Sequence, residues 1–231
     1  MKGRSVVGID GCKGGWIAVR HYESGALDPR IVSSLSDLAP LPDVIAIDIP
    51  IGLRNTGART CDRLARKFIG PRASSVFPAP IRPVLEIDDF SRANKLARSI
   101  HGKGMSKQTV AIMPKIREID KELQSRSTLR NLTYEVHPEV TFRAWLGKDV
   151  EFAKKGKDGF DLRSRLVEEF FGRTAFQYVR ESAPKSVVAD DDILDAFAAV
   201  WSAWRILAGI SLTLPEPHEI DTLGLRMGIW Y

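Results

Sequence analysis

The sequence has few of the residues that would place it in a membrane or an oxidising compartment. It has only two cysteines, Cys12 and Cys61, without CxxC spacing, so it predicts neither a disulfide framework nor a zinc site. No apolar run approaches the roughly 18 residues that a membrane span requires. The first apolar run is interrupted by Asp10, which argues against a signal peptide. We therefore expect a cytoplasmic protein without a membrane partner.

No internal repeat or low-complexity segment is present, and the composition is that of an ordinary globular domain. Of the 231 residues, 44% are hydrophobic and 27% are charged, which suits one large domain. The formal net charge is +5, and basic residues cluster at residues 54–72 and 148–165. Such clusters suit a phosphate-bearing partner, although a solvated surface would produce the same pattern.

Apolar runs and helical segments follow one another as in an α/β protein. Residues 6–10 and 16–22 flank a GCKGG turn and predict a hairpin, with a third strand at residues 29–33. The almost wholly apolar run at residues 44–50 predicts a central strand covered on both faces. Residues 134–138 predict a fifth strand. We expect a mixed sheet flanked by helices, with three antiparallel strands followed by parallel ones.

The remaining segments are predicted to be mostly helical. Ser91 is expected to cap a helix, and Pro114 is expected to kink or break another. Residues 178–180 suit a strand or a loop, and the proline-rich tail after Gly209 has no predicted element. We expect a single domain over residues 1–231, with residues 52–133 as a helical insertion or cap. The predicted helices cover residues 60–69, 91–101, 106–124, 140–146, 162–171 and 190–204.

Acidic residues lie at the ends of the apolar strands. Asp10 ends the first strand and Asp48 lies near the end of the central one. A buried carboxylate is unfavourable there unless it is paired or binds a cation. We expect both side by side at one sheet edge, with Glu135 of the fifth strand as a third acid. All-oxygen ligands suit Mg²⁺ or Mn²⁺; capping of neighbouring loops is the alternative.

The run DDDILDAFAAVWSAW at residues 190–204 predicts a helix with an acidic side that is otherwise lined by small residues. Asp192 and Asp195 lie on that side and would complete the metal site. Asp190 is expected to cap the helix. For Asp191 the sequence leaves two roles open, an N-cap residue or a member of the acidic side. An acidic first turn that complements the helix dipole is the simpler interpretation.

Six motifs resemble the domain of unknown function 429 family, described as predicted RNase H-like nucleases. They are GIDG (8–11), IDIP (47–50), CDRLARKFIG (61–70), SSVFPAP (74–80), EVHPE (135–139) and DDILDA (191–196). The resemblance covers nearly the whole chain and implies an RNase H-like fold. It implies catalytic acids on the first and fourth strands, here Asp10 and Asp48. The run DILDAFA is similar to a helix of Holliday-junction resolvases, which implies metal roles for Asp192 and Asp195.

The EVHPE element departs from the resolvase pattern. It leaves open whether Glu135 is a ligand or a residue that supports the ligands. For Glu139, a cap on the following helix is favoured over a ligand role. Glu135 and His137 alternate along the strand and are expected on the same face. His137 is a candidate proton acceptor or donor, with a packing role as the alternative.

Together these features predict a divalent-metal-dependent nuclease or phosphodiesterase that acts on nucleic acid or a nucleotide. The predicted catalytic residues combine the acids with one histidine, and all but that histidine are predicted metal ligands: Asp10, Asp48, Glu135, His137, Asp192 and Asp195. The predicted substrate-binding residues share a positive charge that suits phosphates: Arg59, Arg63, Arg66, Lys155 and Arg163.

Two other functions fit the sequence. GIDGCKGGW superficially resembles the phosphate-binding hairpin of ATP-binding phosphotransferases of the actin and sugar-kinase type, although 231 residues are few for two such domains. A non-catalytic binding module on the same scaffold is the third hypothesis. The sequence does not choose between DNA, RNA and a small nucleotide, and it leaves the oligomeric state open, with a homodimer among the options.

Overall fold

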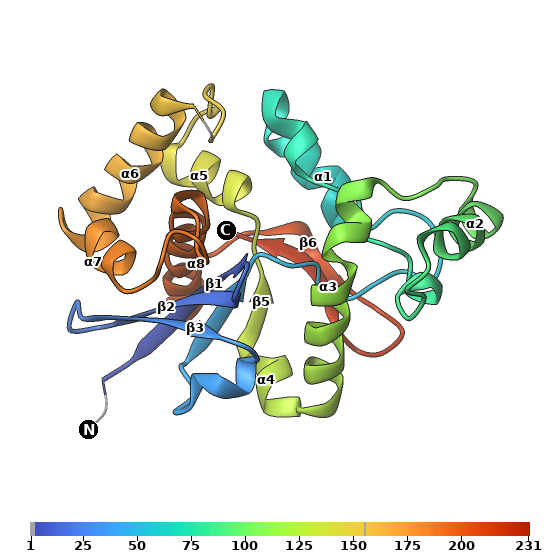
Figure 1. The fold of residues 1–231 in the computed structure, drawn as a ribbon, viewed down its shortest axis with the longest axis horizontal. Coiled ribbons are helices and arrows are strands. Elements are labelled where there is room, and N and C mark those ends of the chain that lie inside the picture. Colours follow the sequence, from blue (N-terminus) through green and yellow to red (C-terminus); the bar gives the residue numbers. More distant parts are fainter. Residues whose placement is uncertain (1–2, 155) are drawn as a thin grey trace.

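The computed structural model describes residues 3–154 and 156–231. Five strands form one mixed sheet in the order β3-β2-β1-β4-β5 (Figure 1). They are β1 (Ser5–Cys12), β2 (Gly15–Tyr22), β3 (Leu27–Val32), β4 (Val44–Ile47) and β5 (Thr133–Glu135). The first three are antiparallel, and β4 and β5 continue from β1 in parallel. The predicted mixed α/β sheet is confirmed, and it is consistent with an RNase H-like fold.

Helices cover both faces of the sheet (Figure 1). Their bounds are α1 (Thr60–Phe68), α2 (Phe90–His101), α3 (Lys107–Ser125), α4 (Ser127–Leu132), α5 (Pro138–Leu146), α6 (Lys157–Phe171), α7 (Ala175–Glu181) and α8 (Asp190–Leu207). Short 3-10 segments are η1 (Leu35–Leu38), η2 (Gly70–Ser75) and η3 (Arg82–Val84). No helix in the described part of the chain is long and apolar enough to cross a membrane.

The central strands are buried on both faces, which explains why they lack polar alternation. On one face, Val6 and Ala46 pack with the apolar side of α8. On the other face, Ile9 and Ile47 pack with residues of α3, among them Ile116. Because α3 belongs to the stretch 52–133, part of that stretch completes the sheet's core, whereas α2 lies farther from the sheet (Figure 1).

Three local predictions differ from the structure. The side chain of Asp89, not Ser91, caps α2, because it accepts a hydrogen bond from the Arg92 amide at 2.7 Å. α3 confirms the helix predicted over residues 106–124 but is not broken at Pro114, which faces solvent. Residues 178–180 belong to the helix α7, because burial of Val179 and Arg180 on one side favours an amphipathic turn.

The proline-rich tail forms a hairpin that the sequence did not predict. β6 (Thr213–Ile220) pairs antiparallel with β7 (Arg226–Trp230), and their register shifts between Leu214 and Glu219. The prolines of β6 lie in this irregular part, where fewer backbone donors are required. Trp230 of β7 also forms a bridge to Val136, just after β5. The tail therefore packs beside the end of β5.

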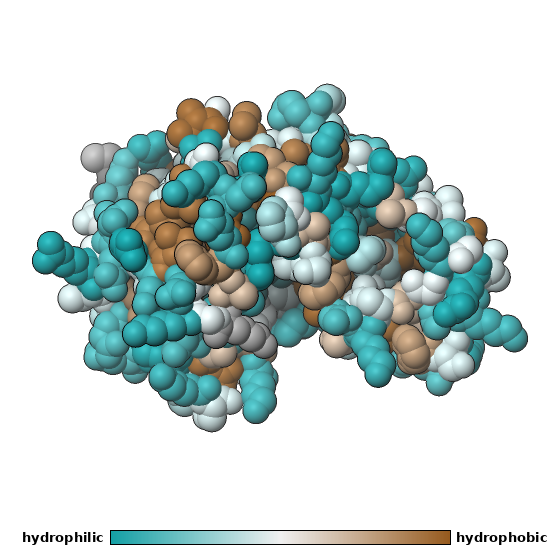
Figure 2. All heavy atoms as spheres, turned by 90° about the horizontal axis from the view of Figure 1, so that it is seen from above, coloured by the Kyte–Doolittle hydropathy of each residue, from teal (hydrophilic) through white to brown (hydrophobic). Residues whose placement is uncertain are grey.

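Figure 2 shows the molecule from above, on the side of α1, α5 and α6, and hydrophilic side chains cover most of this face. A hydrophobic area lies in the left-hand half of that view, and a notch in the outline separates the two halves. This surface is mixed in character.

Candidate functional site

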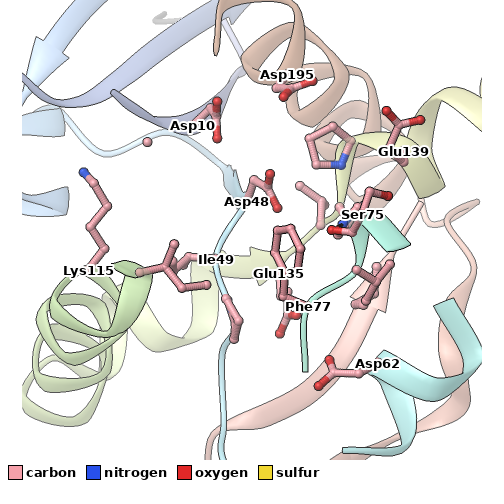
Figure 3. Close-up of a pocket in the computed structure, with 18 of the residues that line it drawn as sticks. Asp10, Asp48, Ile49, Asp62, Ser75, Phe77, Lys115, Glu135, Glu139 and Asp195 are labelled. Atoms are coloured by element: carbon pink, nitrogen blue, oxygen red, sulfur yellow. Dashed lines mark hydrogen bonds between the residues drawn. The ribbon is translucent and has the colours of Figure 1, made fainter. Parts of the chain in front are cut away.

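A pocket of about 400 Å³ opens where β1, β4 and β5 reach their carboxyl ends (Figure 3). Its acidic wall comes from the strand ends and α8, and its other walls come from the α1–η2 region, α3, and the start of α5. Ligands of open α/β sheets bind in crevices at this edge. The pocket is therefore the natural candidate for a functional site.

Strand register brings two of the predicted acids to this edge. Ile9 of β1 lies opposite Ile47 of β4, and the amide of Asp48 donates to the Ile9 carbonyl at 3.0 Å. Asp10 and Asp48 directly follow these paired residues. Both side chains line the pocket, and Figure 3 shows them facing the same space.

Asp195 reaches the same space because α8 packs closely on β1. A Cβ added to Gly8 would lie 2.2 Å from the Ala196 carbonyl oxygen and 2.3 Å from the Val200 amide nitrogen, so this position has no room for a side chain. The helix backbone therefore lies directly against the strand. Asp195, one residue before that contact, lines the pocket with 3% of its surface exposed.

The three carboxyl groups disfavour one another's charge. Burial raises the pKa of Asp10 well above its usual range, and the charges of Asp195 and Asp48 raise it further. Burial raises the pKa of Asp48 to about 7, although Lys154 opposes this shift. The pKa of Asp195 rises to about 6 for the same reason, again against Lys154. The site holds more negative charge than this lysine balances.

Lys154 is a site residue that the sequence did not reveal. Its Nζ lies 2.7 Å from Oδ2 of Asp195 and 3.5 Å from Oδ2 of Asp191. The lysine belongs to the loop between α5 and α6, which a close approach of Ala153 to Gly159 holds against α6. Its basic surroundings made it indistinguishable from surface lysines in the sequence. The predicted neighbour, Lys155, lies outside the described residues.

Glu135 lines the pocket, but its carboxylate is bound elsewhere. Its Oε1 and Oε2 each lie 2.7 Å from a terminal nitrogen of Arg59, and the Ile51 amide also donates to Oε2. Figure 3 shows the carboxylate directed away from Asp10 and toward Asp62. Burial raises its pKa to about 7 despite Arg59. The placement differs from the expected ligand position.

Arg59 is likewise committed inside the protein. Besides Glu135, its guanidinium binds Asp62 at 2.5 Å, and it is 2% exposed. Arg59 with these partners has no donor left for a phosphate, which differs from the substrate-binding role predicted for it. The ion pair of Arg59 with Glu135 fastens the start of α1 to the end of β5. Asp62 also accepts from the Ala79 amide, which ties residue 79 to the same cluster.

Arg59 lines the pocket, whereas the other predicted arginines lie away from it. Arg63 and Arg66 are exposed on α1, and neither lines the pocket. Arg66 donates to the Val76 carbonyl at 2.7 Å. Arg163 is 1% exposed and donates to both oxygens of Glu139 at 2.8 Å. Arg163 is therefore a buried partner of Glu139 and not the predicted substrate-binding residue.

The acids at the start of α8 divide differently from the sequence prediction. Ala189, not Asp190, is the N-cap residue, and the amide of Ala189 donates to Asp192 at 2.9 Å. Asp192 thus stabilises the helix start, and it is not among the residues that line the pocket. Asp190 pairs with Arg180 at 3.0 Å. Because consecutive helical residues point in different directions, these neighbours cannot all face Asp10.

His137 and Glu139 both line the pocket at the start of α5. Nε2 of His137 lies 3.4 Å from the Ser75 carbonyl, whereas Nδ1 is buried and has no partner within the described residues. Burial lowers the pKa of His137, which favours the neutral ring. Glu139 faces the pocket rather than capping the helix, and its charge raises the pKa of Asp48.

The donor types suit a hard cation, but the side chains as they lie do not form a coordination shell. Asp10, Asp48 and Asp195 supply carboxylate oxygens alone, which Mg²⁺ and Mn²⁺ prefer. Their charge exceeds that of Lys154, which favours an additional cation. However, within residues 3–154 and 156–231, no three His, Cys, Asp or Glu side chains converge closely enough to hold a metal ion. The three acids therefore suit a divalent cation by donor type and by charge, but not by the geometry in which their side chains lie.

The model of one protein family matches residues 8–220, and that family is described as "protein of unknown function (DUF429)". The chain belongs to this family. No curated protein and no solved structure matches the chain significantly. The resemblance expected from the motifs is confirmed for the family, whose activity is not described.

Proposed function

We propose that the chain is a hydrolase of phosphate esters, most simply a nuclease or phosphodiesterase, that works with Mg²⁺ or Mn²⁺. The observation that carries the proposal is the meeting of Asp10, Asp48 and Asp195 in one pocket. They come from two adjacent parallel strands and from the helix that packs on them. Acids from these elements are what the RNase H-like resemblance implies. A cytoplasmic setting is part of the proposal, and the two buried, unpaired cysteines support it.

The three carboxylates would hold the ion, which when bound neutralises charge on the phosphoryl group and lowers the pKa of water. The protein's own residues do the remaining work. Lys154 fixes the orientation of Asp195 and offsets part of the acidic charge. Neutral His137 can accept a proton within the pocket, since its lowered pKa leaves the ring free at neutral pH. The apolar wall that includes Ile49 and Phe77 limits water around the substrate.

The test combines a substrate panel with matched variants. Purified protein is incubated with Mg²⁺ or Mn²⁺ and with single-stranded, duplex and branched DNA and RNA, mononucleotides and a chromogenic phosphodiester. Asp10→Asn and Asp48→Asn are expected to lower kcat/KM at least roughly 100-fold while the fold persists. Asp161→Asn, an exposed acid of α6, is the control and is expected to retain full activity. Absence of cleavage on the whole panel, with no metal-dependent rise in Tm, would refute the proposal.

The same samples separate the alternatives. A phosphotransferase of the actin type requires two related domains around its nucleotide, whereas the described residues form a single sheet of five strands and a two-stranded hairpin. Micromolar ATP affinity by calorimetry would favour that alternative nonetheless. If Asp10→Asn changed neither turnover nor ligand binding, a non-catalytic module would explain the chain better.

A further inference from the structure

Arg72 faces the pocket with a guanidinium group that the protein itself leaves unsatisfied. Its side chain is 24% exposed and lines the same pocket as the acids. Within the described residues, its nitrogens donate no hydrogen bond, and its Nε is buried without a partner. An unsatisfied buried donor is unfavourable, so this arginine is suited to a ligand that the chain does not supply.

Glu139 forms a long ion pair with Arg72 that is not a hydrogen bond. Oε1 of Glu139 lies 3.7 Å from Arg72 Nη2, beyond hydrogen-bond length. Both oxygens of Glu139 instead accept from Arg163 at 2.8 Å. Because both oxygens of Glu139 already accept hydrogen bonds from Arg163, the hydrogen-bond donors of Arg72 remain available in the pocket.

The segment that carries Arg72 is fixed in place. Its own carbonyl accepts from the Ser75 hydroxyl at 2.8 Å, which closes the turn of η2. The next residue, Val76, is held by Arg66, and the Ser75 carbonyl lies 3.4 Å from His137 Nε2. A fixed turn holds the base of the Arg72 side chain in place, so the backbone loses little conformational freedom when the arginine binds a ligand.

The pocket also offers features that complement an anion bound to Arg72. Nε2 of His137 faces a carbonyl, which favours the tautomer with the proton on Nε2 and leaves the buried Nδ1 as the ring's unpaired acceptor within the described residues. The start of α5 has no side-chain cap, and its dipole adds positive potential. The apolar residues Phe77 and Ile112 line the same pocket and suit a base or another flat group.

We propose that Arg72 forms an anion subsite that binds a phosphate monoester group of the substrate. This subsite lies beside the carboxylates that act on the substrate. This inference rests on the proposed function and specifies its substrate class. A pocket of about 400 Å³ that contains both groups fits a nucleotide or the phosphorylated end of a strand, rather than the middle of a duplex. Arg72 is thus a specificity-determining residue, because a guanidinium binds the paired oxygens of a phosphate.

The first experiment measures binding of inorganic phosphate by isothermal titration calorimetry, in EDTA and again with Mg²⁺. Arg72→Gln is expected to weaken phosphate binding roughly 10-fold or more, as loss of a charge-assisted contact does. Arg63→Gln, an exposed arginine on the neighbouring α1, should bind like wild type. Equal affinities for wild type and Arg72→Gln, or no binding by wild type at millimolar phosphate, overturn the subsite.

A second comparison identifies the source of the phosphate and keeps the two proposals separable. Mononucleotides are compared with nucleosides, and 5′-phosphorylated oligonucleotides with 5′-hydroxyl ones; Arg72→Gln should abolish whichever preference wild type shows. Asp10→Asn should lose turnover yet keep phosphate binding. Phosphate binding that depends on Arg72 without any hydrolysis would support the subsite and not the hydrolase. Hydrolysis without an Arg72-dependent phosphate preference would support the hydrolase and not the subsite.

A folding control accompanies these measurements. Because Arg72 donates no hydrogen bond within the described residues, Arg72→Gln is expected to leave Tm nearly unchanged. If Tm falls, Arg72→Lys serves instead: it keeps the charge but not the paired donors, and it should recover part of the phosphate affinity. Failure of Arg72→Lys to exceed Arg72→Gln in a folded background would contradict the electrostatic role.

Discussion

The ammonium group of Lys154 lies 2.7 Å from Oδ2 of the buried Asp195. The two residues are 41 positions apart, and the loop between α5 and α6 brings the lysine to the acid. This contact places a positive charge beside three carboxyl groups whose pKa values burial raises. One loop residue therefore supplies the direct counter-charge of Asp195.

Removal of this lysine should destabilise the protein without metal. Lys154→Met leaves Asp195 buried and unpaired, and we expect a loss of about 1–3 kcal/mol in the free energy of unfolding, since the lysine is partly exposed. Urea denaturation in EDTA measures it. Lys148→Met, at an exposed position of the same loop, is the control. An unchanged midpoint in Lys154→Met would show that the contact contributes nothing to stability.

Loss of the buried cluster around Arg59 should lower the free energy of unfolding more than loss of the Lys154–Asp195 contact does. Arg59→Met leaves Glu135 and Asp62 without their shared cation, which predicts a loss of about 3–5 kcal/mol. Adding Glu135→Gln to Arg59→Met should recover part of the loss, because one unpaired charge is removed. Thermal and urea unfolding measure both variants beside the exposed control Arg63→Met. The expectation fails if the single and double variants are equally stable.

Close packing of α8 on β1 predicts that Gly8 tolerates no side chain. The methyl group of Gly8→Ala would meet backbone atoms of Ala196 and Val200, which cannot rotate away. We expect a loss of about 3 kcal/mol or more, at the upper end for overpacking. Gly3→Ala, where an added Cβ meets nothing within 4 Å, is the control. Similar Tm values for the two alanine variants would contradict the packing.

Stability in EDTA should fall as pH rises through the titration of Asp48. Its folded-state pKa of about 7 lies above the unfolded value of about 3.9. The folded state therefore holds more protons between about pH 4 and 7, and it loses stability as they dissociate.

Replacing Asp48 tests this sign. Asp48→Asn removes the buried charge, so its Tm should exceed that of wild type at pH 8 and converge with it near pH 4. Differential scanning calorimetry across that range, with Asp161→Asn as a pH-independent control, makes the comparison. A Tm difference that grows toward low pH would reverse the assigned direction.

Much of the fold follows from patterns within single segments. The unbroken apolar run before Asp48 indicates a strand covered on both faces, and β4 is covered by helices on both sides. Strand ends and helical periodicity placed Asp10, Asp48 and Asp195 together, because these patterns depend on a residue and its near neighbours. The hairpin of β6 and β7 escaped prediction, since its prolines are tolerated by an irregular register that only pairing creates.

The tertiary structure decided which charged side chains face the pocket. Glu135 shares the strand-end position of the other acids, yet a partner 76 residues away binds both of its oxygens. Asp192 shares the acidic side of α8, yet the preceding backbone uses it as a cap. Lys154 and Arg72 lie in basic stretches whose other described members face solvent or bind inside the protein. The sequence thus determined where acids meet, because strand and helix periods are local. Their counter-charges and the open donors of Arg72 depend on long-range packing, which no short pattern encodes.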